Sequence, residues 1–109
     1  QFYIVARRSD FSVLAVAVHG VSDQLVALGK VSKPWVLASR ARRDAHKSLA
    51  DNAAEASTLV AQLDELERGA VAANDLRKLS GALAQATAIK DRLDGLLASS
   101  NAAYRVYNQ

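Results

Sequence analysis

The sequence contains no cysteine, no methionine, one proline and five glycines. The lack of cysteine excludes disulfide scaffolds, zinc ribbons, thiol redox motifs and cysteine nucleophiles. With only two histidines, a metal site would need several carboxylates to converge on them. Alanine is abundant, with 22 residues, and half of the chain is apolar. This composition predicts one folded, helix-rich domain over residues 1–109 and is too hydrophobic for a disordered chain.

Motifs that bind phosphates or metals are missing as well. The chain has no GxGxxG or GxxxxGK[ST] loop, no HExxH and no calcium-binding loop pattern. Asp64, Glu65 and Glu67 point to different sides of a helix, so they form no carboxylate pair for acid–base catalysis. We therefore expect no enzymatic activity, cofactor, metal or small-molecule substrate.

Residues 1–8 join an apolar, aromatic run to two arginines. This pattern is typical of the last turn of a membrane helix and suggests a juxtamembrane or processed segment. The alternative is an apolar first turn that packs on the bundle. We expect no intact membrane span, because the best window, 11–29, contains polar residues such as His19 and Asp23. The localisation stays open between a soluble domain and part of a membrane-attached or processed protein.

Apolar residues recur at alternating spacings of three and four, which is typical of helices that pack along a seam. Val13, Val16 and Val26 widen the first stripe, so the first helix should be heavily buried. The second register runs from residue 34 and has two polar exceptions, Arg42 and Asn52. The three seams are Phe11, Leu14, Val18, Val21, Leu25 and Leu28; then Trp35, Ala38, Arg42, Ala45, Leu49, Asn52, Ala56, Leu59, Leu63, Leu66 and Ala70; then Leu76, Leu79, Leu83, Ala86, Ile89, Leu93 and Leu97.

Helix boundaries follow from capping residues. Gly29 fits a helix end, and Ser32 followed by Pro34 fits the start of a second helix over 34–68. Gly69 fits its end, and Asn74 fits the cap of a third helix. The sequence thus predicts an all-α antiparallel bundle of three long helices, and a break near 50–54 would make four. Residues expected to be buried are Leu14, Val18, Leu25, Leu49, Leu59, Leu63, Leu79, Leu83 and Leu93.

Two glycines lie inside the expected third helix. Gly81 and Gly95 each weaken it by about 1 kcal/mol relative to alanine. Such residues permit a close approach of another helix, or a bend near Gly95.

His46 lies beside the second seam with cations around it. A half-exposed imidazole can accept a phosphoryl group, and nearby cations would stabilise its charge. The chain length, Ala45-His46-Lys47 and the later Asn74-Asp75-Leu76 resemble histidine phosphotransfer domains, which are small four-helix bundles. The resemblance implies that His46 is a phosphoacceptor for a receiver protein. Leu49 and Ala50 stand where that family usually has lysine and glycine. The alternative is a solvated surface histidine.

His19 and Trp35 also have two interpretations each. His19 sits on an almost entirely apolar helix, which favours a hydrogen-bonded histidine at the core or its edge over a metal or haem ligand. We expect the Trp35 side chain to pack in the core at the end of the bundle, because it opens the second seam. The alternative is that it is exposed and anchors a protein partner.

The charges are unevenly distributed. A basic block over 30–47 contains six cations and one acid, and 51–67 contains five acids and no base. The basic block could bind nucleic acid or an anionic membrane surface, although no aromatic residues are interleaved with it. Pairing with the acidic block, within or between chains, is the simpler account. The candidate interaction residues are Lys33, Arg40, Arg42, Arg43 and Lys47.

The polar seam residues suggest an assembly. Arg42 and Asn52 would bury a charge and an amide, which coiled coils tolerate when such residues pair and fix the register. Arg42 could meet Asp91 and Asp94 of the third helix, or Asp51 and Glu55 of a second molecule. We therefore expect a homo-oligomer in which basic and acidic blocks oppose each other, weakened by salt. The expected function is that of a non-catalytic interaction module, a sensor or adaptor segment or a subunit of a larger assembly.

Overall fold

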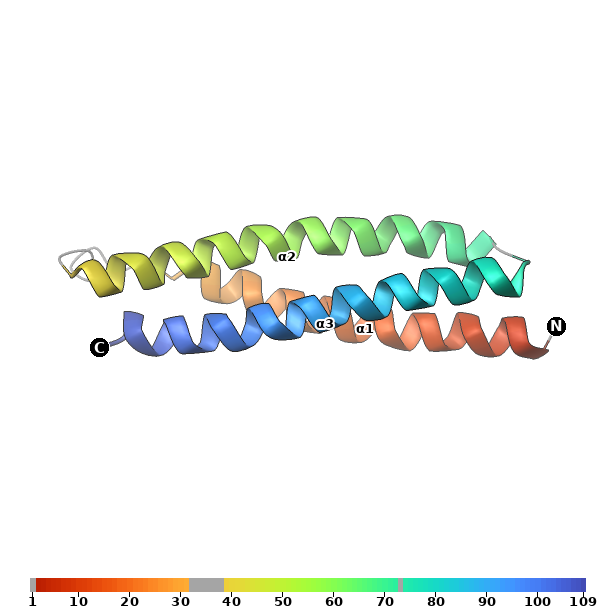
Figure 1. Cartoon of the computed structure of the whole chain (residues 1–109), viewed down its shortest axis with the longest axis horizontal. Helices are drawn as coiled ribbons and strands as arrows, with labels where there is room; N and C mark the ends of the chain where they lie inside the picture. Colours follow the sequence, from red (N-terminus) through yellow and green to blue (C-terminus); the bar gives the residue numbers. More distant parts are fainter. Residues whose placement is uncertain (1, 32–38, 73) are drawn as a thin grey trace.

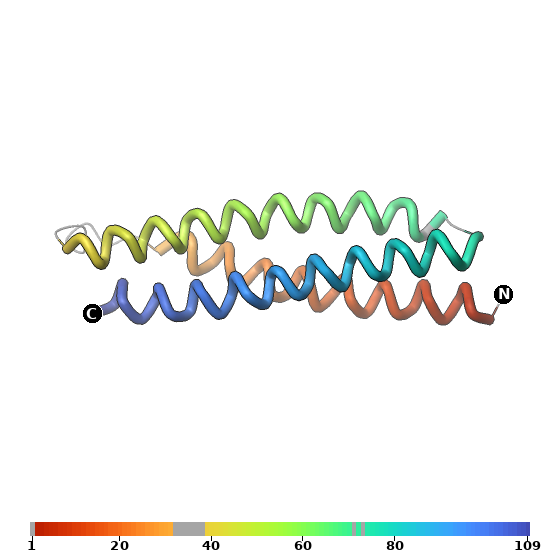
Figure 2. Tube along the Cα trace, viewed as in Figure 1, coloured from red at the N-terminus to blue at the C-terminus, as the bar shows by residue number. Residues whose placement is uncertain are grey.

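The chain forms an elongated helical bundle of 59 × 17 × 15 Å in a computed structural model that describes residues 2–31, 39–72 and 74–109 (Figure 1). Within these ranges the helices are α1 (Phe2–Gly29), α2 (Arg40–Ala72) and α3 (Leu76–Tyr107). Each of the three packs on the other two. The trace in Figure 2 runs back and forth, so that α2 is antiparallel to both α1 and α3. The prediction of an all-α antiparallel bundle is confirmed.

The predicted register of α2 is confirmed. The seam positions that recur every seven residues from 49 onward are fully or almost fully buried. They are Leu49, Ala56, Leu63 and Ala70. Alanines in two of these four layers let the helices approach closely, which gives the bundle its thin cross-section. The buried core that joins all three helices consists of Phe11, Ala15, Val18, Leu25, Ala56, Leu63, Ala70, Leu79, Ala86, Ile89, Leu93 and Leu96.

Most of the expected core residues are buried. Leu14, Leu59 and Leu83 are only partly buried, and the other six of the nine predicted residues are fully covered. Leu96, which the third seam omits, belongs to the core.

The outer side of α1 contradicts one expectation. Val13 and Val16 were expected to widen the buried stripe, and they are 70% and 75% exposed. Among the described residues, α2 and α3 are the helices that cover α1, and two neighbours cover one side of a helix. The buried residues of α1 accordingly recur every three or four positions on that side, at Phe11, Ala15, Val18, Ser22 and Leu25.

The boundaries of α2 differ in part from those expected. The end of α1 at Gly29 is confirmed, whereas Ser32, Pro34, Trp35 and Lys33 lie outside the described residues. The helix continues without a break through 50–54, so the four-helix alternative is wrong. The prediction that it ends at Gly69 is also wrong. It runs on to Ala72, because burial of Ala70 against the core offsets the helix-weakening effect of one glycine.

The cap of α3 is Asp75, not Asn74 as expected. Asp75 has an extended backbone, and its carboxylate accepts a hydrogen bond of 2.8 Å from the backbone N–H of Arg77. This satisfies one of the unpaired donors of the first turn. Asn74 instead accepts a hydrogen bond of 3.0 Å from the guanidinium of Arg8, which ties the start of α1 to the α2–α3 connection.

The close helix approach occurs at a different glycine from those expected. A Cβ placed on Gly81 or Gly95 would meet no heavy atom within 4 Å, so no neighbouring helix approaches either glycine closely. A Cβ on Gly29 would collide with the Cβ of Ala53 and lie 3.2 Å from the carbonyl oxygen of Leu49. The end of α1 therefore packs directly against the backbone of α2.

The first residues of the chain belong to α1. Residues 2–8, set apart above as a juxtamembrane or processed segment, form its first turns. By length and composition alone α1 could cross a membrane, so the expectation that the window falls short was wrong by that measure. Mostly buried core helices of soluble proteins and N-terminal signal sequences pass the same test, and in α1 28% of the apolar window is buried against the bundle.

Truncation of Leu63 to alanine should lower the free energy of unfolding by about 2–5 kcal/mol, because this side chain is fully buried in the core. Urea denaturation followed by circular dichroism measures the change. Leu76→Ala is the matched control, since Leu76 is 39% exposed and should lose well under half as much. Equal losses for the two variants would show that the register of α2 is wrong.

Alanine substitutions at two glycines should have opposite signs. Gly95→Ala should raise the free energy of unfolding by about 0.5–1 kcal/mol, because the site is open and alanine favours the helix. Gly29→Ala should lower it, because its methyl group would overlap Ala53. Thermal denaturation of both variants tests the close contact, and stabilisation by Gly29→Ala would contradict it.

Candidate interaction surface

The outer face of α1 is apolar. Two of its central residues, Val13 and Val16, project into solvent. Among the described residues, five of the seven large hydrophobic side chains that are exposed lie on this helix. The seven are Phe2, Tyr3, Val5, Val13, Val16, Leu76 and Tyr104.

Three of these exposed residues, Phe2, Val13 and Val16, belong to a second heptad seam, which we call the outer seam. Its members are spaced alternately by four and three residues, as in a helix that packs along a coiled-coil partner. All are exposed except Ala6, which is partly buried. The outer seam consists of Phe2, Ala6, Ser9, Val13, Val16, Gly20, Asp23 and Ala27.

The other two helices present polar outer faces. On α2 the exposed residues include Arg43, Asp44 and Lys47, and on α3 they include Asp91 and Arg92. A helix that is apolar on two sides needs two sets of packing partners, whereas a helix with one polar side needs only one. Within the described part of the chain, α1 has such a partner for its inner side alone.

A groove runs beside the outer seam, between α1 and α2. It encloses about 610 Å³ and is lined by Ser12, Ala15, Val16, His19, Gly20, Asp23 and Glu67. Val16, Gly20 and Asp23 are shared with the outer seam, so the exposed ridge and the groove form one surface. Nothing lies within 4 Å of a Cβ placed on Gly20, which leaves room for another helix.

His19 connects the two walls of this groove. Its Nε2 lies 3.1 Å from Oδ1 of Asp64, and both side chains are nearly half exposed. The prediction of a hydrogen-bonded histidine at the edge of the core is confirmed. In the described ranges no cluster of three or more His, Asp or Glu residues could hold a metal ion.

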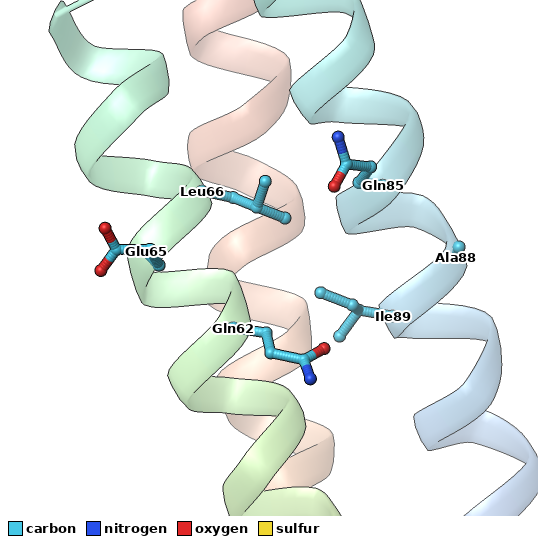
Figure 3. A pocket seen from close by; sticks show the side chains of 6 residues that line it. All are labelled: Gln62, Glu65, Leu66, Gln85, Ala88 and Ile89. Atoms are coloured by element: carbon cyan, nitrogen blue, oxygen red, sulfur yellow. The ribbon is translucent and has the colours of Figure 1, made fainter.

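A smaller depression lies between α2 and α3 (Figure 3). Leu66 and Ile89 point toward each other across it, with Gln62 and Gln85 beside them, and it encloses about 470 Å³. The carboxylate of Glu65 turns away from it and pairs with Arg68. This depression can accept an apolar side chain, but it brings together no general acid, base or nucleophile.

His46 lies at the opposite end of the bundle from the N-terminus. Its Nε2 is 3.1 Å from the carbonyl oxygen of Val31, and its ring centroid is 5.8 Å from that of Tyr107. A carbonyl oxygen only accepts hydrogen bonds, so Nε2 carries the proton. The phosphoacceptor role of His46 stays a prediction. Phosphorylation at Nε2 would require the loss of the bond to Val31.

The basic block is spread over this end of α2. Arg40, Arg43 and Lys47 are exposed on one face, and the amine of Lys47 lies 2.7 Å from the carboxylate of Asp51. Arg42 is partly buried, and its guanidinium donates a hydrogen bond to the carbonyl oxygen of Gln109. The remaining candidate, Lys33, lies outside the described residues. Binding of nucleic acid or a membrane surface by this block stays a prediction.

The polar seam residues have partners within the chain. Besides the bond of Arg42 to Gln109, the side-chain amide of Asn52 donates a hydrogen bond of 2.9 Å to Oγ of the fully buried Ser100. The acid Asp94, proposed above for Arg42, pairs with Lys90. Arg42 was expected to meet one of several acids, and its guanidinium instead meets the main-chain oxygen of Gln109. The main reason to expect an oligomer held by opposed basic and acidic blocks was that Arg42 and Asn52 lacked partners within one chain. That reason no longer applies.

Of the acids in the acidic block, Glu55 and Asp64 pair with residues of other helices, and Asp51 and Glu65 pair within α2. Glu55 of α2 accepts two hydrogen bonds from Arg92 of α3, at 2.5 Å from Nε and 2.9 Å from Nη2. The hydrogen bonds from Arg92 lower the pKa of Glu55 below its ordinary value. This bidentate ion pair joins α2 to α3 across the surface.

The Glu55–Arg92 pair predicts a defined pH dependence. A carboxyl group whose pKa is lower in the folded than in the unfolded chain stabilises the fold at neutral pH, and this contribution disappears as the pH falls through the folded pKa. Glu55→Gln should therefore destabilise the protein slightly at pH 7. The difference from the wild type should close below about pH 4.3, the ordinary glutamate pKa. Denaturant titrations at several pH values measure it, and a difference that widens in acid would contradict the pair.

Comparison of the chain with protein families, with curated proteins and with solved structures finds no match. The surface described above is therefore the basis for assigning a function.

Proposed function

We propose that the protein is a non-catalytic helical interaction module and that it binds a helix of a protein partner along the outer seam of α1. The observation that carries this proposal is the exposure of Val13 and Val16 in the middle of a heptad pattern. The partner helix would supply the second packing neighbour that this pattern requires.

The size of the surface supports a binding role. From Phe2 to Ala27 the outer seam is about 37 Å long and one helix diameter wide, which makes roughly 400 Å² of mostly apolar surface. Patches of this size lie within the range of the largest apolar patch on a monomer, about 300–600 Å², and are often functional. Each valine that moves from water into a contact contributes roughly 1.5–3 kcal/mol.

The chemistry of the remaining surface favours binding over catalysis. In the described ranges, His19 is hydrogen-bonded to Asp64 across the groove and His46 to a backbone carbonyl. Apart from Glu65, whose carboxylate turns away and pairs with Arg68, the depression of Figure 3 is lined by amide and alkyl groups. Amides and alkyl groups neither transfer protons at neutral pH nor act as nucleophiles.

A reporter thiol can test this proposal directly, because the chain has no cysteine. Val16→Cys would carry an environment-sensitive dye at nanomolar protein concentration. The probe is a designed amphipathic helix of the same length as α1, with leucine at its seam positions and charges elsewhere. We expect saturable binding and a blue shift of the dye, because the peptide removes Val16 from water.

The matched control carries the same dye at Ser57→Cys, on the exposed face of α2. This reporter should not respond, and Val13→Asp in the Val16→Cys chain should weaken binding at least tenfold. The absence of a response at position 16, or equal responses at positions 16 and 57, would refute the proposed function.

A further inference from the structure

We infer that the partner on the outer seam of α1 is a second copy of this chain, docked antiparallel about a two-fold axis between Val13 and Val16. This inference rests on the proposed function and names its partner. In such a dimer the same surface of both copies is used, and the α1 helices of the two copies lie side by side.

The layers of the outer seam are complementary in volume in this orientation. A two-fold axis between Val13 and Val16 sets the largest seam residue, Phe2, against the small Ala27, and it leaves two valines against each other at the centre. A parallel pair would instead set Phe2 against Phe2 and Gly20 against Gly20, which gives one overfilled and one empty layer. The antiparallel layers, each formed twice, are Phe2 with Ala27, Ala6 with Asp23, Ser9 with Gly20 and Val13 with Val16.

Charge gives the same orientation. A parallel dimer would place two Asp23 carboxylates in one layer, and like charges in a seam repel each other. The antiparallel dimer places Asp23 opposite Ala6, so the two Asp23 carboxylates lie in different layers.

The area predicts a weak dimer. Roughly 400 Å² on each copy makes about 800 Å² in total, which is below the 1,200–2,000 Å² of a standard stable interface. We therefore expect dissociation in the micromolar range, so that dilution and concentration switch the chain between monomer and dimer. The apolar centre should keep the dimer intact in molar salt, unlike a dimer held by opposed basic and acidic blocks.

Sedimentation equilibrium of the full chain, from low to high micromolar concentration and at low and high salt, tests the association. Val16→Asp should weaken dimerisation at least tenfold, which corresponds to 1.4 kcal/mol. Its position is 75% exposed, so the fold should tolerate the change, and circular dichroism checks this. Ala61→Asp, on the exposed face of α2, is the control and should leave the dimer unchanged.

Disulfide formation tests the orientation. Under mild oxidation, a mixture of Ser9→Cys and Gly20→Cys chains should form a cross-linked pair, because residues 9 and 20 share a layer in the antiparallel dimer. Ser9→Cys alone should not cross-link, because the two copies of residue 9 would be about 16 Å apart along the axis. Efficient cross-linking of Ser9→Cys alone would refute the antiparallel arrangement.

The remaining outcomes separate the two proposals. A strict monomer whose Val16→Cys reporter still binds the amphipathic helix would overturn the dimer and leave the interaction module standing. A monomer without that response would overturn both. A dimer that survives Val16→Asp, or that dissociates in high salt, would overturn the α1 interface. A Val16→Cys reporter that responds only to phosphatidylcholine vesicles would replace both proposals with a membrane surface.

Discussion

Burial of one stripe of α1 between α2 and α3 is the interaction on which the bundle depends. Val18 and Leu25 are fully covered, and Phe11 is almost so, because both neighbouring helices contact this side. Two neighbours cannot also cover the opposite side of the same helix. The apolar residues that remain there are therefore a consequence of the helix count, and any further burial has to come from outside the described bundle.

The alanine-rich composition makes this arrangement tight. Layers such as Ala56 and Ala86 contribute little side-chain volume, so the helices approach closely and the end of α1 contacts α2 backbone at Gly29. Thin layers bury less apolar area than leucine layers, and each buried methylene contributes about 0.8 kcal/mol. The fully buried leucines, such as Leu49 and Leu63, therefore provide a large share of the stability.

Polar groups inside the bundle fix the register rather than add much stability. Asn52 of α2 reaches the fully buried Ser100 of α3, and a shift by one layer would leave both groups without this partner. Arg42 reaches the carbonyl of Gln109 at the end of the chain in the same way. A buried polar group that loses its partner costs about 1–3 kcal/mol, so the Asn52–Ser100 pair disfavours neighbouring registers, whereas the bond of Arg42 is exposed and contributes less.

Heptad spacing was sufficient to predict the helices and the inner seam, because it is a local property of the sequence. The position of Leu63 in the core followed from spacing alone. The partners of Arg42 did not, since the carbonyl of Gln109 lies 67 residues away and backbone groups carry no sequence signal. Capping by Asp75 rather than Asn74 was missed because adjacent residues of similar chemistry compete for one position.

The outer seam of α1 was visible in the sequence but was interpreted wrongly. Val13 and Val16 follow heptad spacing of their own, yet periodicity gives only the faces of a helix and not the number of neighbours that cover them. An amphipathic helix needs one partner surface, and a helix with two apolar seams needs two. The three helices of residues 2–31, 39–72 and 74–109 supply one of these partner surfaces for α1. The sequence thus contains one more apolar seam than the described helices can cover. This uncovered seam is the basis of the association that we propose, and it lies on α1 rather than in the charged blocks.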